Sequence, residues 1–262
     1  LANALVSKGH SVTWFSSTFI HSKKKLVTTK NKDYYLRENY TLKLIHAGNG
    51  FKSNISLCRY LFYKNYSRKL NTAIKLMQEP DIIVCAFPLI DVAYRVVKYA
   101  NIKNIPIILD IRDLWPDTII NAMPTYLRGL VRIILNKDFL MTKYVLKKST
   151  ALCAMSIGVL NWGLHNAKRQ KSKNDLVVPI GYSKSSYNEN VFNADDLNPK
   201  IKNIHLKSKK IFTYVGTFGF TYDLDLILEV AAKIEKSEPV IVFILAGAGP
   251  KLKYLKSVYD KL

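Results

Sequence analysis

The chain has 262 residues, enough for two ordinary domains or one large one, and its 48% content of hydrophobic residues excludes a globally disordered protein. Its apolar runs stay far below the roughly 18 residues of a membrane-spanning helix, so none is predicted. The formal net charge of +21 indicates an anionic partner: nucleic acid, an acidic membrane surface or a phosphorylated substrate. A lysine- and asparagine-rich composition of the kind that an AT-rich genome produces explains the charge about equally well.

The three cysteines are odd in number and widely spaced. Cys58, Cys85 and Cys153 therefore form neither a disulfide framework nor a metal motif. Cys85 and Cys153 lie inside apolar runs typical of strands. We expect buried thiols in a reducing compartment.

The first residues predict a helix whose apolar face already includes Leu1, with no helix-start signal before it. Leu1, Ala4 and Leu5 lie on one helical face, Gly9 is placed to end the helix, and a strand follows at Val12–Phe15. The helix has no start signal, and a strand would normally precede it in an α/β unit. We therefore expect that the chain is cut at its N-terminus.

Apolar strands then alternate with amphipathic helices. The predicted strands are Asp81–Phe87, with both faces buried, followed by Ile105–Ile111, Thr150–Met155 and Asp175–Gly181. The predicted helices run from Leu89 to Ala100 and from about Pro124 to Lys148. This alternation predicts the α/β class, with a parallel sheet covered by helices on both faces.

A second α/β pattern follows a polar segment. Residues 182 to 210 are rich in Ser, Asn, Lys and Asp and predict a linker. Beyond it come a strand at Ile211–Val215, a helix from Leu224 to Ile234 and a strand at Val240–Ala246. Because so few strands cannot close a core, we expect that the C-terminus is also missing.

A dense polar cluster follows the predicted strand at Ile107–Ile111. Within "IILDIRDLWPD" the polar or aromatic members are Asp110, Arg112, Asp113, Trp115 and Asp117. Two interpretations stay open: a salt-bridged strand terminus, or one wall of a binding site.

Two glycine loops follow neighbouring strands of the second pattern. Gly216 and Gly219 come after one strand, and "AGAGP" (246–250) comes after the next. Backbone N–H groups in such loops converge where a phosphate binds well. Plain tight turns are the alternative, but two adjacent loops favour a nucleotide site.

Two further patterns have a structural and a functional interpretation. Asp223-Leu224-Asp225 resembles a metal-binding Asp-x-Asp, but at a helix start we interpret it as capping. Between Asn121 and Lys148, six basic residues accompany the single acid Asp138. Such a helix can lie on an anionic membrane, although a core-packing helix with a solvated basic face is the preferred interpretation.

Five segments together resemble a known family. "KGHSVTWFSS", "IPIILDIRDLWPD", "VVPIG", "FTYVGTFGFTYDLDLILEVAAKI" and "FILAGAGPKLKYL" occur in the order and spacing of the retaining glycosyltransferases of family 4. The resemblance covers nearly the whole chain and is closest to members that build bacterial lipopolysaccharide O-antigen or capsule. Its most specific part is the pairing of "DIRDLWP" with "YVGTFGFTYDL".

The resemblance implies a GT-B fold with two Rossmann-like domains and a reaction in the cleft between them. Residues 1–182 would form the N-terminal acceptor-side domain, without its first strand. Residues 183–208 would be the linker, and 209–262 would begin an incomplete C-terminal domain that binds the nucleotide sugar.

The resemblance also implies site residues. Arg112 and Asp113 would be catalytic: the guanidinium would hold a phosphate or sugar hydroxyl, and the carboxylate would orient the acceptor hydroxyl or receive its proton. Many relatives place a histidine where Arg112 stands. The acceptor-side residues would be Phe87, Asp110 and Trp115. The donor-binding residues would be Gly216, Thr217, Phe218, Gly219, Gly247 and Gly249.

The chain departs from the family pattern in three places. The N-terminal glycine-rich loop would precede Leu1, and the Glu-x7-Glu segment would follow Leu262. Thr217 and Tyr222 stand where many relatives have Arg and Lys. The last departure leaves open which cation neutralises the pyrophosphate.

The implied activity is transfer of a hexosyl or N-acetylhexosaminyl group from a nucleoside-diphosphate sugar to a polyprenyl-phosphate-linked saccharide, with retained configuration. No cofactor and no obligatory metal are expected. The enzyme would be cytoplasmic and peripheral on the anionic inner face of the cell membrane. Nucleic acid is disfavoured as a partner because the lysines are scattered through loops without a recognisable binding module. The alternatives are a GT-B-fold sugar-nucleotide epimerase and a truncated non-catalytic remnant.

Overall fold

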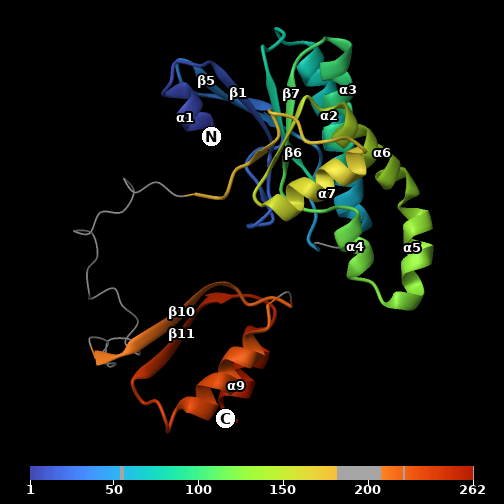
Figure 1. The fold of residues 1–262 in the computed structure, drawn as a ribbon. Helices are drawn as coiled ribbons and strands as arrows, with labels where there is room; N and C mark the ends of the chain where they lie inside the picture. The colour runs from blue at the N-terminus through green and yellow to red at the C-terminus, as the bar shows by residue number, and fades with distance from the viewer. Residues whose placement is uncertain (54–55, 182–207, 221, 262) are drawn as a thin grey trace. The chain divides into compact units, whose positions relative to one another are not determined.

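The computed structural model describes residues 1–53, 56–181, 208–220 and 222–261. It divides into two compact units, Leu1–Gly181 and Tyr182–Leu262 (Figure 1). Each is a mixture of helices and strands. The predicted linker, 183–208, lies outside the described residues except for Ser208.

The first unit begins with a short helix and a small sheet. Helix α1 (Ala2–Val6) leads into β1 (Val12–Ser17), which pairs in parallel with β5 (Tyr40–Ile45). Strand β4 (Lys32–Arg37) pairs antiparallel with the other edge of β5, and the order is β1-β5-β4. A two-stranded hairpin, β2 (Phe19–Ile20) with β3 (Lys25–Leu26), lies between β1 and β4 in sequence.

A four-stranded parallel sheet forms the centre of this unit. Its strands, in spatial order, are β6 (Ile83–Phe87), β7 (Ile107–Ile111), β8 (Ala151–Ala154) and β9 (Leu176–Val177). The parallel α/β prediction is thus confirmed for this sheet. Strand β9 is shorter than the predicted Asp175–Gly181.

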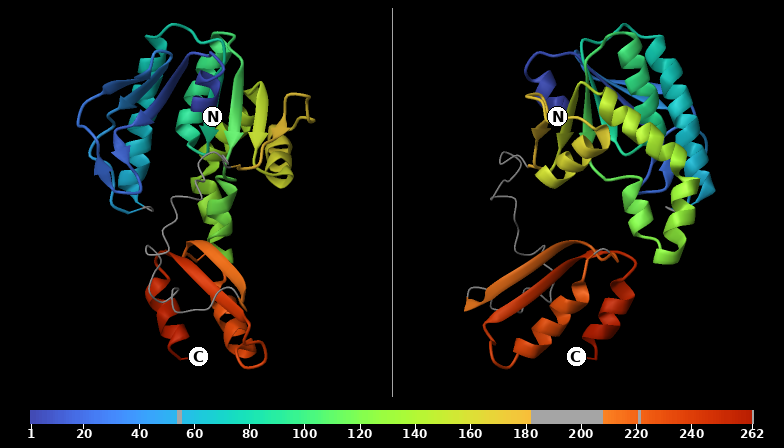
Figure 2. Two further views of the ribbon diagram at one scale, coloured as in Figure 1. Left: turned by 90° about the vertical axis from the view of Figure 1, so that its left-hand side faces the viewer. Right: turned by 45° about the vertical axis from the view of Figure 1, so that its right-hand side comes forward.

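Helices connect these strands. They are α2 (Leu57–Lys75), α3 (Ile90–Ile102), α4 (Asp117–Asn121), the 3-10 helix η1 (Thr125–Leu127), α5 (Arg128–Ile134), α6 (Asn136–Lys148) and α7 (Ile157–Ala167). Residues 117–134, which we call the helical arm, project from the unit in both views of Figure 2. The single helix predicted from Pro124 to Lys148 is instead divided into η1, α5 and α6.

One large core holds the first unit together. Buried side chains of α2, α3, α6 and α7 pack with the alternate residues Ile107, Leu109 and Ile111 of β7. The predicted burial of β6 on both faces is wrong: Cys85 and Phe87 are buried, whereas Val84 is exposed. The reason is that these four helices contribute to a single core cluster, which takes only one set of alternating strand side chains.

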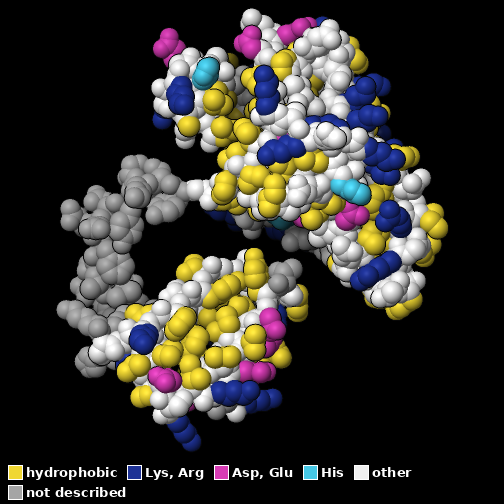
Figure 3. All heavy atoms as spheres, viewed as in Figure 1, with side chains coloured by type: hydrophobic (Ala, Val, Ile, Leu, Met, Phe, Trp, Pro, Cys, Tyr) yellow, Lys and Arg dark blue, Asp and Glu magenta, His cyan; other side chains and the backbone are white. Residues whose placement is uncertain are grey.

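The second unit is a parallel pair with two helices. Strands β10 (Lys210–Thr217) and β11 (Ile241–Ala248) are followed by α9 (Leu224–Ile234) and α10 (Leu252–Tyr259), respectively. Among its described residues, the buried hydrophobic side chains are Phe218, Leu224 and Leu255. Apolar side chains gather on the face of this unit that Figure 3 shows. Phe212 and Val215 of β10 are both exposed.

Candidate functional site

The carboxyl ends of β6, β7 and β8 meet at one edge of the parallel sheet. Register places Ala86, Asp110 and Cys153 side by side, one step before the strands end. The backbone N–H of Arg112 donates to the carbonyl oxygen of Phe87 at 3.1 Å, so the chain leaves β7 next to the end of β6. Polar residues that follow these strands therefore collect at this edge, as is usual in parallel sheets.

Asp110 and Arg112 form an ion pair at this edge. Both Nε and Nη2 of Arg112 donate to Oδ2 of Asp110, at 2.8 and 2.7 Å. The arginine side chain is 65% exposed, whereas that of the aspartate is 22% exposed. The guanidinium is thus oriented by a half-buried carboxylate while its far side faces solvent, which suits contact with an anionic ligand.

Asp113 stabilises the start of the helical arm. Its Oδ1 accepts hydrogen bonds from the Leu114 backbone N–H at 2.7 Å and from the Thr118 hydroxyl at 2.9 Å. These bonds satisfy donors at the entry to α4, as a capping carboxylate does. One carboxylate oxygen of Asp113 therefore has a structural role.

Trp115 packs against the core and beneath an arginine that the sequence analysis did not single out. The guanidinium carbon of Arg59 lies 5.3 Å from the Trp115 ring centroid and 5.7 Å from that of Tyr63. Arg59 comes from the first turn of α2, far from Trp115 in sequence. Packing of Trp115 in the loop is thus observed, and Arg59 brings a second cation to the neighbourhood of the site.

Phe87 lies in the core and offers no exposed side-chain surface to a ligand. Its side chain is fully buried, and its ring centroid lies 6.2 Å from that of Trp162. Trp162 in turn donates its indole N–H to Asp117 Oδ2 at 2.8 Å, which ties α7 to the first residue of α4. The expected acceptor-side role of Phe87 therefore does not fit its side chain.

Cys153 is a register partner of Asp110 and Cys85 is a register partner of Leu109, and both thiols stay protonated near neutral pH. Burial, with a smaller effect of Asp110, raises the pKa of Cys85 to about 12. Burial and Asp110 also raise the pKa of Cys153, while Arg112 opposes that shift. Neither thiol is suited to be a nucleophile, because the thiolate is the reactive form. Their predicted burial is confirmed for Cys85, whereas Cys153 is half-buried and Cys58 is exposed.

The glycine loops of the second unit pack backbone against backbone. Gly216 and Gly247 are register partners at the carboxyl ends of β10 and β11. A Cβ atom on Gly247 would lie 1.9 Å from the Gly216 carbonyl oxygen, and one on Gly249 would lie 2.4 Å from the Phe218 carbonyl oxygen. Close approach of the two loops thus accounts for both glycines at these positions.

The other predicted donor residues lie in the same loop. The backbone N–H of Phe218 donates to the Ala248 carbonyl at 2.9 Å, and that of Gly219 donates to Thr217 at 2.9 Å. Phe218 itself is buried in the small core of this unit. These two backbone N–H groups are thus bonded within the protein, and the Phe218 ring is a core residue.

The two aspartates of the Asp-x-Asp motif make contacts within the protein: one caps a helix and the other forms an ion pair. Asp223 Oδ1 accepts from the Leu226 backbone N–H at 3.4 Å, so its predicted capping role is confirmed. Asp225 forms an ion pair with Lys251, which raises the pKa of that lysine. Across the described ranges, no group of three or more His, Cys, Asp or Glu side chains is placed to hold a metal ion.

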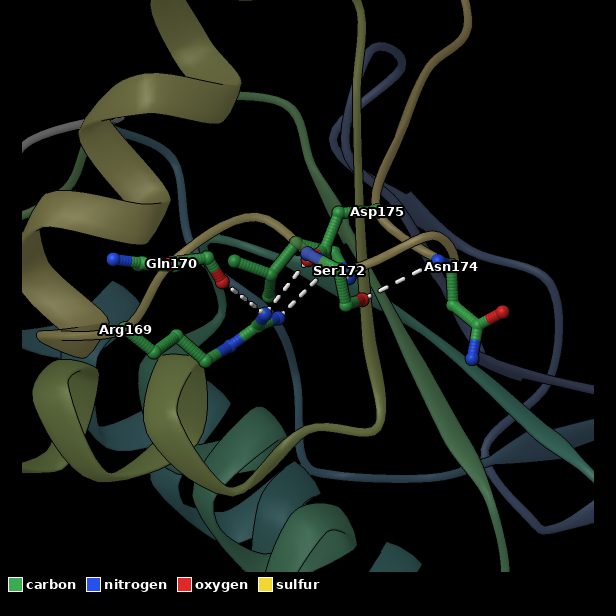
Figure 4. A network of polar contacts seen from close by, with 6 residues as sticks. Arg169, Gln170, Ser172, Asn174 and Asp175 are labelled. Carbon is green, nitrogen blue, oxygen red and sulfur yellow. Dashed lines mark hydrogen bonds and ion pairs between the residues drawn. The ribbon is translucent and has the colours of Figure 1, made fainter.

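A second charged cluster lies at the opposite, amino end of the sheet (Figure 4). Asp175 is almost fully buried and is bound by Arg169, whose Nη1 and Nη2 donate to Oδ2 and Oδ1, each at 2.7 Å. The backbone N–H groups of Leu152 and Ser172 also donate to this carboxylate. The cluster fastens the loop before β9 to β8, and we interpret it as structural.

A groove of about 670 Å³ lies next to the small sheet, and its lining does not include Asp110 or Arg112. Its lining includes Phe15 and Ser17 of β1, Leu44 of β5 and Tyr63 and Tyr66 of α2. Burial, followed by Cys85 and Tyr63, raises the pKa of Tyr66 well above its ordinary value. Neither Arg112 nor Asp113 lines this groove, so the sequence-predicted catalytic residues occupy an open surface.

Comparison with models of known protein families gave no match, and comparison with curated proteins gave none either. In the part of the chain that the structure describes, no helix combines the length and the apolar character needed to cross a membrane.

Proposed function

We propose that the chain is part of a retaining glycosyltransferase with a GT-B fold, which acts in the biosynthesis of a cell-surface polysaccharide such as O-antigen or capsule. The observation that carries the proposal is the pair of glycine loops at the ends of β10 and β11. They follow adjacent parallel strands, and the first of them leads into α9. Backbone N–H groups in such a position suit a diphosphate.

Three further features support the proposal. The motifs "DIRDLWP" and "YVGTFGFTYDL" resemble those of family 4. Both units contain parallel strands whose carboxyl ends carry polar or glycine-rich loops. The oriented, exposed guanidinium of Arg112 provides a cation in the first unit.

In the proposed reaction, an acceptor hydroxyl oxygen bonds to the anomeric carbon of the donor sugar. The bond from that carbon to the phosphate oxygen breaks, and the nucleoside diphosphate leaves with the electron pair. Arg112 stabilises the charge that develops on a phosphate or hydroxyl oxygen. The Oδ2 atom of Asp113 receives or orients the acceptor proton, while Oδ1 keeps its structural bonds.

The proposed partners follow from this reaction. The donor is a nucleoside-diphosphate sugar, and the acceptor is a saccharide on a polyprenyl phosphate. The protein works without a cofactor or an obligatory metal, and it acts in the cytoplasm on the inner membrane surface.

Donor binding tests the proposal first. Saturation-transfer difference NMR of the intact chain with UDP-, GDP- and dTDP-sugars is expected to show binding of one nucleotide class, competed by the matching free diphosphate. Absence of saturation transfer from all three classes would contradict the proposal.

Substitutions at the first unit test the assigned roles. Arg112→Ala and Asp113→Asn are expected to lower the release of nucleoside diphosphate from the bound donor by about 100-fold, the usual effect of losing one charge-stabilising or acid–base group. Asp113→Asn keeps an Oδ1 acceptor for Leu114 and Thr118, so the fold is retained. Arg68→Ala, on the exposed surface of α2, is the matched control.

A further inference from the structure

The end of the helical arm exposes a continuous apolar surface. Tyr126 is 83% exposed, Leu130 57%, Ile133 74% and Ile134 68%. We call these four residues the apolar ridge. Their spacing places them on one face of η1 and α5. No residue of α5 is buried, so this helix contributes nothing to the core of the unit.

The opposite face of α5 holds the arm in place. Arg128 donates from Nε to the Met123 carbonyl at 3.0 Å and from Nη2 to the Asn121 carbonyl at 3.3 Å. The guanidinium carbon of Arg132 lies 4.7 Å from the centroid of the Phe139 ring of α6. The arginines thus tie α5 to its neighbours, and the ridge faces outward on a supported helix.

Basic residues continue along the exposed side of α6. Lys137, Lys143 and Lys147 are exposed, and so is Leu140 between them. The single acid of this stretch, Asp138, is half-buried, and burial raises its pKa, with a further contribution from Asp91. Figure 3 shows hydrophobic and basic side chains together on the arm and the adjoining helix. The surface is therefore both apolar and positively charged.

We propose that the apolar ridge inserts into the surface of an anionic lipid bilayer, with Lys137, Lys143 and Lys147 at the headgroups. Anionic lipid is the partner because it matches both properties: acyl chains receive the apolar side chains, and phosphate groups attract the lysines. The choice rests on the proposed function, in which the acceptor is lipid-linked. Insertion goes beyond electrostatic adsorption, because part of the binding must persist at high salt.

Vesicle co-sedimentation of the intact chain tests the proposal. Vesicles of phosphatidylcholine with about 30 mol% phosphatidylglycerol are compared with pure phosphatidylcholine, at low and high salt. We expect stronger binding to the anionic vesicles and a fraction that remains bound at high salt. Binding that is independent of lipid charge, or that salt removes completely, would overturn insertion at an anionic surface.

Variants separate the apolar contribution to vesicle binding from the electrostatic one. Ile133→Gln with Ile134→Gln is expected to lower the partition coefficient at least about 10-fold at both salt concentrations, because two apolar side chains no longer leave water. Replacing Lys137, Lys143 and Lys147 by Gln is expected to remove the salt-sensitive fraction alone. Leu76→Gln with Ile102→Gln, at two other exposed apolar positions, is the matched control. An equal loss in that control would overturn the role of the ridge.

Two measurements keep the outcomes distinct. Sedimentation velocity reports whether the ridge joins two copies of the chain: a ridge variant that changes the oligomeric state but not vesicle binding overturns the proposal. Donor binding by NMR in the same variant is expected to be unchanged. Loss of vesicle binding with retained donor binding leaves the proposed function intact, and absence of donor binding in the unaltered chain counts against the function alone.

Discussion

Two aspartate–arginine pairs of the first unit differ in what surrounds them. In the Asp110–Arg112 pair the arginine is exposed, and such a pair contributes at most about 1 kcal/mol to stability. In the Arg169–Asp175 pair the aspartate side chain has no exposed surface. Removing one partner of a buried pair leaves the other without compensation and costs about 3–5 kcal/mol. The same two residue types thus serve a site in one place and the fold in the other.

Asp175→Asn is expected to lower the free energy of unfolding by about 3 kcal/mol at pH 7, because Arg169 and two backbone N–H groups lose a charged acceptor. Urea unfolding followed by circular dichroism measures the change. Asp110→Asn is the matched control and should cost less than about 1 kcal/mol. Equal losses in the two variants would contradict the structural role of Asp175.

The difference in stability between the parent chain and Asp175→Asn should depend on pH, and the direction of that dependence follows from the pKa of Asp175. Burial alone would raise the pKa of Asp175, but the hydrogen bonds from Arg169, Ser172 and Leu152 outweigh it and hold the pKa well below its ordinary value. A lowered pKa stabilises the fold above the unfolded value, about 4, and that contribution is lost as the pH falls toward the folded value. The gap in stability between the parent chain and Asp175→Asn should therefore shrink between about pH 5 and pH 2.

The pairing of β10 with β11 depends on glycine where the strands end. Gly247→Ala would place a Cβ atom 1.9 Å from the Gly216 carbonyl oxygen, and backbone would have to move. We expect a loss of about 3 kcal/mol in the local stability of this pair. Hydrogen exchange of the backbone amides of residues 210–217, followed by mass spectrometry, measures it.

Gly129→Ala in α5 is the contrasting control. Apart from its two chain neighbours and the helix's own nearby backbone, no atom lies within 4 Å of the position that its Cβ atom would take. Alanine has the higher helix propensity, so this change should stabilise α5 by up to about 1 kcal/mol. Faster exchange in the β10 peptides after Gly129→Ala would show that the readout is not specific to the glycine pair.

The predictability of these elements followed the strength of their apolar pattern. Strand β7 and helix α3 carry long apolar runs, and both were predicted near their observed bounds. Helix α2 buries Phe62, Tyr66, Ser67 and Leu70 among many polar residues, so its apolar face was too narrow to be recognised. The apolar run of β6 also did not reveal that Val84 and Ala86 are exposed while Cys85 and Phe87 are buried.

The candidate site was only partly predictable, because some of its residues are brought together by the packing of distant elements. Asp110 and Arg112 were found because a dense polar cluster directly follows an apolar strand and because "DIRDLWP" resembles a family motif. Arg59 could not be found, because its place over Trp115 depends on how α2 packs. The burial of Phe87 depends likewise on Trp162, which a distant helix supplies.

At the scale of the whole molecule, the two units differ greatly in core size. The first has a core cluster drawn from both of its larger sheets and four helices, whereas the described part of the second buries Phe218, Leu224 and Leu255. Burial of so few side chains offsets little of the conformational entropy lost on folding. The first unit therefore carries most of the stability of this chain.

Separate expression tests this asymmetry. Residues 1–181 are expected to unfold cooperatively with a melting temperature close to that of the first transition of the whole chain, as measured by differential scanning calorimetry. Residues 208–262 alone are expected to show no cooperative transition. A sharp transition in the smaller fragment would contradict the view that its core is too small.

The short connection between β4 and β5 affects the order in which the first unit can fold. Glu38 and Asn39 alone separate the two strands, so this antiparallel pair forms after a very small loop closure. The β7–β8 pair can form only after a much larger loop closes, because the long helical segment between Ile111 and Ala151 separates the two strands. Local contacts form in microseconds, whereas non-local parallel pairing is slower. We therefore expect the β4–β5 hairpin to order before the sheet edge that carries Arg112.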